Sequence, residues 1–191
     1  MITSCIKNCR GSAAIEFAVI MPFFIFLLFG SVELSRFIII NQKLEATSST
    51  MADLATQGSN ISRTSLQQIA NAASIMMNPY AANTSVIFSS AAGSCPRRGG
   101  RGGGRGNRPC ITWQYEPQGA DRSRVGAVGA APTLPNNYSV AAGQNVIVAE
   151  TFYRFAPLFN ITAALIPALN NHILYYVALY KPRQGSLTTL N

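Results

Sequence analysis

The longest apolar run in the chain lies close to its N-terminus. It covers residues 13–32, AAIEFAVIMPFFIFLLFGSV, and Glu16 is its only charged residue. A helix rises about 1.5 Å per residue, so twenty residues cover roughly 30 Å, the thickness of the hydrocarbon core of a bilayer. A helix buried in a soluble protein is rarely apolar on every face, as this one is. The pattern therefore predicts one membrane-spanning helix, and we call residues 13–32 the apolar segment.

The charges on either side of the apolar segment predict its orientation. Lys7 and Arg10 lie just before it, whereas acidic and basic residues balance one another after it. Positive charge favours the cytoplasmic side, so the N-terminus is expected in the cytoplasm and the rest of the chain outside it. A cleaved signal peptide is the alternative. We favour a retained anchor, because the apolar segment contains an acid and ends in a poor cleavage site, FGSVELSR.

Apolar residues continue beyond this segment in steps of three and four. This spacing predicts that the helix runs on, with an apolar stripe, to about Thr56. A break at residues 58–60, GSN, precedes Ser62, which is expected to cap a second helix that ends at Asn78-Pro79. The apolar positions of the first helix are Phe37, Ile40, Leu44, Met51 and Leu54, and those of the second are Leu66, Ile69, Ala73, Met76 and Met77.

The remaining pattern is typical of strands. Short runs rich in β-branched and aromatic residues lie at 85–89, 111–115, 146–155 and 174–180. In the second run Ile111, Trp113 and Tyr115 alternate with polar residues, as in a half-buried strand. We therefore predict an α+β fold, in which a long N-terminal transmembrane and amphipathic helix and a second helix pack on a small antiparallel sheet. The expected divisions are a leader (1–11), an anchor helix (12–56) and an extracytoplasmic head (57–191).

The formal net charge of +8 is concentrated in one place. Residues 95–110 contain five arginines between Cys95 and Cys110, in a glycine-rich context. Such a tract resembles an RNA-binding RGG box. The alternative is a flexible surface loop closed at its base by a Cys95–Cys110 disulfide, with adhesion to anionic polymers as a further role. We favour the loop and expect no nucleic-acid partner, because the predicted topology keeps this tract out of the cytoplasm and an oxidising compartment permits the disulfide.

Residues suited to catalysis or metal binding are few. His172 is the only histidine, and the acids beyond Asp53 are Glu116, Asp121 and Glu150. Cys5 and Cys9 precede the apolar segment and are expected to stay reduced, so the four cysteines would be divided by the membrane. We therefore expect neither an enzyme, nor a metal site, nor a cofactor.

The residues around the start of the apolar segment carry a resemblance to a known family. Residues 11–17, GSAAIEF, follow a basic leader and resemble a prepilin-peptidase site. Together with the later Pro22, Gly30, Glu33 and Arg36, they resemble the N-terminal signature of TadE-like proteins, the minor pseudopilins of tight-adherence (Tad) pilus systems. The resemblance covers about the first 55 residues.

This resemblance implies roles for four residues. A membrane prepilin peptidase would cut between Gly11 and Ser12. Glu16, followed by Phe17, would then be the fifth residue of the mature chain, where pilins carry an acid that pairs with the new α-amino group of a neighbouring subunit. Such a pair offsets the cost of a carboxylate in the bilayer and sets the register. The simpler alternative places Glu16 at the cytoplasmic boundary, where it reaches water.

The resemblance also implies a function and partners. We expect a minor pseudopilin of the bacterial inner membrane that helps assemble a Tad-type pilus for adhesion. Its partners would be the prepilin peptidase, other pilin or pseudopilin subunits and the pilus assembly machinery. The alternative is a permanently anchored envelope protein whose head binds a polymer and never enters a filament.

Overall fold

The structure is a computed structural model, which describes residues 9–58, 60–95, 108–117, 120–160, 167, 170–185 and 187–190; only the backbone is described for 9–12. The chain divides into two compact units. The anchor unit comprises residues 1–39 and 156–171, and the head unit comprises residues 40–155 and 172–191.

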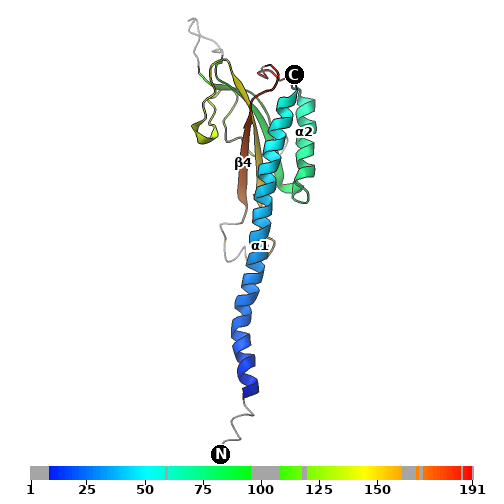
Figure 1. Cartoon of the computed structure of the whole chain (residues 1–191), viewed down its shortest axis with the longest axis vertical. Coiled ribbons are helices and arrows are strands. Elements are labelled where there is room, and N and C mark those ends of the chain that lie inside the picture. The colour runs from blue at the N-terminus through cyan, green and yellow to red at the C-terminus, as the bar shows by residue number, and fades with distance from the viewer. Residues whose placement is uncertain are drawn as a thin grey trace, which may run out of the picture. The chain divides into compact units, whose positions relative to one another are not determined.

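The element order confirms the predicted α+β fold (Figure 1). All four strands form one antiparallel sheet in the order β2-β1-β3-β4, so β1 and β3 are the inner strands. All four strands lie within two or three residues of their predicted bounds. The main elements are α1 (Cys9–Gln57), α2 (Arg63–Met76), β1 (Thr84–Ala92), β2 (Cys110–Tyr115), β3 (Asn145–Phe155) and β4 (His172–Tyr180).

One face of the sheet is covered by α2 and by the part of α1 that belongs to the head unit. Ile40, Leu44 and Met51 of the predicted stripe are buried. The predicted inclusion of Leu54 is wrong, since its side chain is 36% exposed and the neighbouring Ala55 takes the inward position. An α-helix has about 3.6 residues per turn, so position 55 continues the direction of positions 44 and 51 more closely than position 54 does.

Two polar side chains of α1 hold this helix to its neighbours. The Ser48 hydroxyl is buried and donates a hydrogen bond to the Ala149 carbonyl of β3 at 2.8 Å. The Lys43 ammonium donates to the carbonyls of Met76 and Asn78 at 3.2 and 2.9 Å. A cation is favourable beside the unpaired carbonyls at the C-terminus of α2.

The predicted N-cap of α2 is confirmed. The Ser62 hydroxyl accepts a hydrogen bond from the Ser65 backbone amide, and the Ser65 hydroxyl accepts one from the Ser62 amide. This reciprocal arrangement satisfies donors that a helix start otherwise leaves unpaired. Leu66 and Ala73 then face the core.

An irregularity in β2 changes the predicted alternation of that strand. Ser90 pairs with Trp113 and Ala91 pairs with Ile111, so Thr112 is an extra residue in the ladder. Because of this bulge, Trp113 joins the core beneath the helices, whereas Ile111 joins the core on the opposite face. The Thr112 hydroxyl donates to the Ser90 carbonyl at 3.2 Å.

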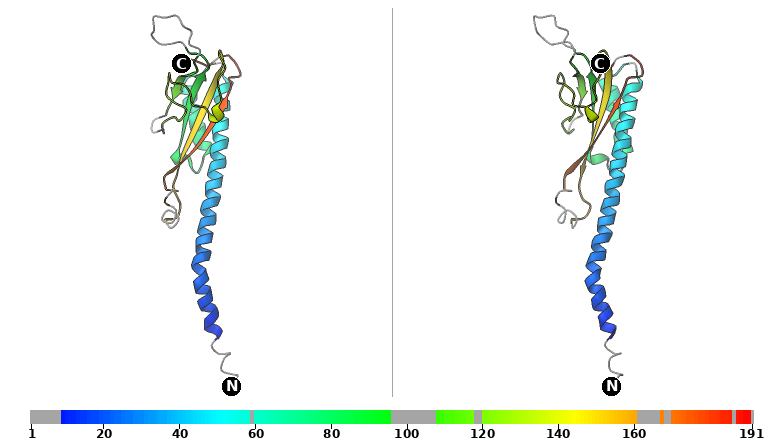
Figure 2. Two further views of the ribbon diagram at one scale, coloured as in Figure 1. Left: turned by 90° about the vertical axis from the view of Figure 1, so that its left-hand side faces the viewer. Right: turned by 60° about the vertical axis from the view of Figure 1, so that its left-hand side comes forward.

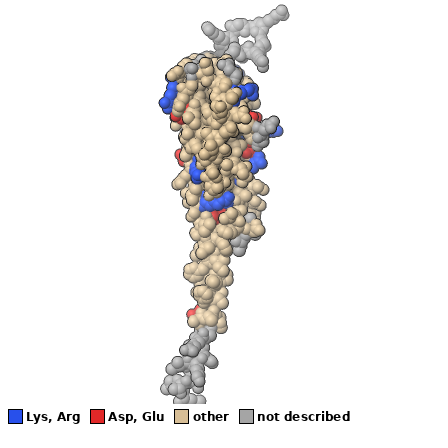
Figure 3. Space-filling view, turned by 90° about the vertical axis from the view of Figure 1, so that its right-hand side faces the viewer, with Lys and Arg blue, Asp and Glu red and all other residues tan. Residues whose placement is uncertain are grey.

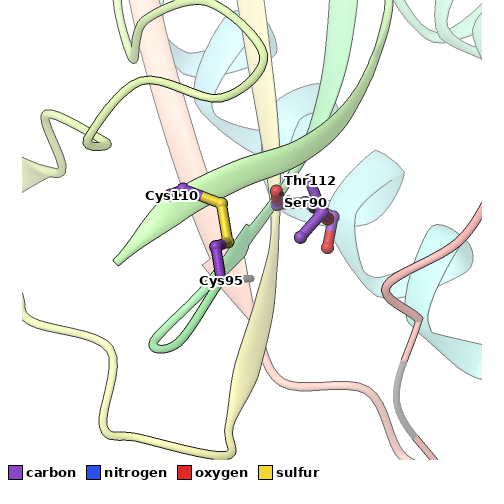
Figure 4. The surroundings of a disulfide bond; sticks show 4 residues. All are labelled: Ser90, Cys95, Cys110 and Thr112. Carbon is purple, nitrogen blue, oxygen red and sulfur yellow. Dashed lines mark hydrogen bonds between the residues drawn. A yellow bond between two sulfur atoms is a disulfide. The ribbon is translucent and has the colours of Figure 1, made fainter. Parts of the chain in front are cut away.

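The predicted disulfide between Cys95 and Cys110 is present beside this bulge (Figure 4). The two Cα atoms are 6.0 Å apart, and Cys110 is the first residue of β2. A cross-link that closes a loop of this size contributes about 3 kcal/mol in the chain-entropy account. The predicted flexible loop itself falls on residues 96–107, which lie outside the described residues.

The other face of the sheet is covered by the connection between β2 and β3 (Figure 2). Val125, Leu134 and Val140 of this connection are buried against Val146 and Val148 of β3. The sheet is therefore enclosed by helices on one side and by an irregular segment on the other.

A buried carboxylate fastens this irregular segment to the sheet. Glu150 of β3 is fully buried and accepts hydrogen bonds from the Ser123 hydroxyl, from the backbone amides of Arg124 (2.8 Å) and Val125 (3.2 Å), and from the Tyr175 hydroxyl (3.0 Å). The Arg124 guanidinium lies 4.6 Å from the centre of the Tyr175 ring. Burial, followed by the charge of Glu150, raises the pKa of Tyr175 above its ordinary value.

The C-terminal residues close the head unit around the end of α1. The Leu187 carbonyl accepts hydrogen bonds from Ser90 and from the Trp113 indole, both at 2.9 Å. Arg183 pairs with Asp53, and hydrogen bonds from Gln57 and then from Arg183 lower the pKa of that carboxyl.

Replacing Glu150 by alanine should destabilise the head unit by about 3 kcal/mol, because several buried donors lose their acceptor. The measurement is denaturant unfolding of the full chain in detergent micelles, followed by the emission of the buried Trp113. Glu116→Ala, which removes an exposed carboxylate, is the matched control and should change stability by less than about 0.5 kcal/mol. Equal effects of the two substitutions would contradict the role given to Glu150.

The raised pKa of Tyr175 predicts a pH dependence of stability. Above about pH 10 the unfolded chain releases the Tyr175 proton, whereas the folded chain keeps it. The contribution of Tyr175 to the free energy of unfolding is therefore complete below that pH and declines above it. The difference in unfolding free energy between wild type and Tyr175→Phe should therefore shrink between about pH 9 and about pH 11. A difference that stays constant over this range would contradict the assignment.

Candidate functional site

The N-terminal part of α1 presents an apolar surface on all sides. Every side chain from residue 13 to residue 28 is exposed, and the most apolar stretch of the helix has a mean hydropathy of 2.3 with none of it buried. In Figure 3 this part of the helix is almost wholly free of Lys, Arg, Asp and Glu on the face shown. Soluble proteins rarely expose a continuous apolar surface of this size, and such a surface indicates contact with lipid or with another protein. The helix is long and apolar enough to cross a membrane.

The residues of the expected cleavage site lie near the beginning of this helix. α1 starts at Cys9, so its backbone already includes Gly11 and Ser12, whose side chains lie outside the described part of the chain. The first turn of a helix lacks partners for its amides, and glycine weakens a helix by roughly 0.5–1 kcal/mol relative to alanine. Unwinding at this end is therefore less costly than unwinding further along α1.

The two residues expected to act in assembly lie one turn later. Both Glu16 and Phe17 are exposed, Phe17 at 62%. Residues four apart share one face of a helix, so position 12 and Glu16 lie on the same side of α1. Cleavage before Ser12 would create an α-amino group at position 12. Its positive charge and the carboxylate of Glu16 would then lie on the same face of the helix.

At the other end of the apolar segment the structure shows a polar cluster, in which Glu33 and Arg36 have partners that the sequence did not reveal. Glu33 is only 4% exposed, and its carboxylate accepts the Leu158 amide at 3.1 and 3.3 Å. Arg36 lies 3.3 Å from the same carboxylate and donates to the Ala156 carbonyl at 2.8 Å. We call these four residues the Glu33 clamp. It holds residues 156–160 against α1 within the anchor unit.

An aromatic contact extends the clamp toward the apolar segment. The rings of Phe29 and Phe159 have their centres 4.6 Å apart. Phe29 belongs to the apolar segment, so the residues that follow the clamp lie beside its last turn. Leu158, whose amide belongs to the clamp, directly precedes Phe159 in the chain and is 61% exposed.

The sequence carried one signal for the clamp. Glu33 precedes Phe37 and Ile40 by four and seven residues, so it occupies a position of the stripe that the helix turns toward its own chain. An acid at such a position predicts a buried partner. Nothing in the pattern pointed to residues 156–158 as that partner, because they lie more than 120 residues away.

The described ranges contain few residues suited to catalysis or to metal binding. Within them, no three His, Cys, Asp or Glu side chains gather as ligands for a metal ion. His172 is exposed at the start of β4. The candidate functional surface is therefore the apolar half of α1 with the Glu33 clamp.

Comparison with known proteins agrees with this choice of surface. Residues 11–53 match the family described as TadE-like protein. The comparisons with curated proteins and with solved structures gave no match. The matched residues include Gly11, Glu16, Glu33 and Arg36. The predicted resemblance is thus confirmed over residues 11–53, where this chain is similar to the TadE-like family.

Proposed function

We propose that this chain is a minor pseudopilin that helps assemble a Tad-type pilus in adhesion. Its apolar segment spans the bacterial inner membrane, with the N-terminus in the cytoplasm and the head outside. The observation that carries the proposal is the coincidence of the family match, residues 11–53, with the exposed apolar half of α1. The role is structural and involves no catalysis by this chain.

Processing by a prepilin peptidase is the first step of the proposed function. Cleavage between Gly11 and Ser12 removes Lys7 and Arg10 together with the rest of the leader. It thereby removes the charges that hold the N-terminus at the cytoplasmic surface. Gly11 suits the bond to be cut, because a residue without a side chain extends readily into a protease cleft.

Glu16 then acts in subunit assembly. An ionised carboxylate within a bilayer costs about 3 kcal/mol on insertion scales unless a partner neutralises it. The new α-amino group at Ser12 of a neighbouring subunit supplies such a partner. The pair selects one axial register between the helices, because a shift by one turn separates the charges by about 5.4 Å.

The partners follow from these steps. They are the peptidase, other pilin or pseudopilin subunits whose helices pack beside α1 in lipid, and the machinery that extracts these subunits. Small residues at positions 12–14, SAA, permit close approach of a neighbouring helix.

The processing step predicts a new N-terminus. In cells that express the peptidase, mass spectrometry of the membrane-extracted chain should show that residues 1–11 are missing and that Ser12 is first. Gly11→Val should block this change, since a branched side chain obstructs the extended backbone. Gly30→Ala is the matched control, because an added Cβ there meets nothing within 4 Å, and it should leave processing intact. A wild-type chain that still begins with Met1 would refute the step.

The assembly step predicts the effect of removing Glu16. Glu16→Ala should abolish or strongly reduce piliation, counted by electron microscopy, while the amount of membrane-bound chain stays normal. Glu45→Ala removes an exposed acid further along the same helix and should leave piliation unchanged. Normal piliation with Glu16→Ala would instead favour a permanently anchored envelope protein that stays outside the filament.

A further inference from the structure

The segment that follows β3 brings apolar side chains to the outer end of the apolar segment. Phe159 contacts Phe29, which lies three residues before the end of the apolar segment. Three residues of helix correspond to about 4–5 Å, so both rings lie at a depth slightly inside that boundary. Leu158, the neighbouring residue, has a largely exposed side chain.

Two polar backbone groups of the same segment are paired with side chains of α1. The Leu158 amide donates to Glu33, and the Ala156 carbonyl accepts from Arg36. The remaining residue of this stretch, Pro157, has no amide hydrogen to satisfy. A non-helical backbone tolerates the edge of a bilayer only where its polar groups are paired within the protein. The clamp meets this condition for the Ala156 carbonyl and the Leu158 amide, and it leaves the Leu158 side chain exposed.

We infer that Leu158 and Phe159 form a second membrane contact, inserted into the outer leaflet beside α1. This inference rests on the proposed membrane span of α1 and adds a lipid-binding role for the Glu33 clamp. Aromatic and large aliphatic side chains are favoured at this depth, where one end of the residue is dry and the other is near headgroups. The occupant of this surface is lipid, because the surface continues directly from the lipid-facing residues of the apolar segment.

The Glu33 clamp also neutralises charge at the edge of the bilayer. Glu33 and Arg36 are the first ionisable residues after the apolar segment, and both direct their polar atoms at the backbone of residues 156–158. They neutralise each other at the boundary and so avoid an unpaired charge beside lipid. The membrane is thus contacted by two stretches of chain that are far apart in sequence.

The test places a tryptophan at residue 158 of the full chain. Leu158→Trp is reconstituted into vesicles of phosphatidylcholine and phosphatidylglycerol in equal amounts, with or without bromine on the upper acyl chains. The emission of the tryptophan at position 158 should lie at shorter wavelength than that of a tryptophan exposed to water. It should lose a large fraction of its intensity in brominated lipid. The wild-type chain, whose single tryptophan is Trp113, measures the background.

Two matched variants make the outcome decisive. Val128→Trp replaces an aliphatic residue of similar exposure in the head unit, 58% against 61%, and should be unquenched. Leu28→Trp lies in the apolar segment and should be quenched if α1 spans the bilayer. Quenching of Leu28→Trp without quenching of Leu158→Trp would overturn this inference and leave the proposed span intact. Absence of quenching in both would overturn the span itself.

A further variant tests the role of the clamp. In the Leu158→Trp background, Glu33→Ala removes the acceptor of the Leu158 amide and should reduce the quenching. Glu45→Ala in the same background should leave the quenching unchanged. Full quenching in the Glu33→Ala variant would overturn the role assigned to Glu33.

Discussion

One uninterrupted helix has to satisfy two different surroundings, and the remaining structure depends on this constraint. From residue 13 to residue 28 the side chains of α1 are exposed and almost all apolar, whereas from Ile40 onward one face is buried against a sheet. The change requires no break in the backbone. The side chains change instead, since the later part of the helix places Thr47, Ser48 and alanines among the buried Ile40, Leu44 and Met51. Small residues let the helix approach the sheet closely, and the Ser48 hydroxyl reaches a strand carbonyl.

Three carboxylates of this chain differ in where the groups that pair with them lie. Glu150 is enclosed by protein and is satisfied entirely by donors from one connecting segment and one tyrosine. Glu33 is satisfied partly by a neighbouring arginine and partly by a distant backbone amide. Glu16 is expected to obtain its counter-charge from another subunit. The first carboxylate fixes a loop, the second holds two distant stretches of chain together, and the third is proposed to act between subunits.

Much of the fold follows from periodicity in the sequence. The helix bounds, the Ser62 cap and the four strands were predictable because each depends on local pattern and on turn residues. The bulge at Thr112 was not, because its position is set by the pairing of β2 with β1 and by the burial of Trp113. Leu54 was misassigned because spacing in steps of three and four tolerates neighbouring positions at the edge of a stripe. In the same way, the residues at the start of α1 were recognisable from a short motif, whereas the partners of Glu33 depend on the path of the whole chain.

The disulfide beside the bulge has a consequence for how this protein can vary. It fixes the distance between the two ends of the interval that it closes, since the Cα atoms of Cys95 and Cys110 lie 6.0 Å apart. Loop-closure entropy grows only slowly with length. An insertion between Cys95 and Cys110 should therefore add little to the entropy cost of closing this interval. This interval is also the natural position for a reporter sequence that must not disturb the fold.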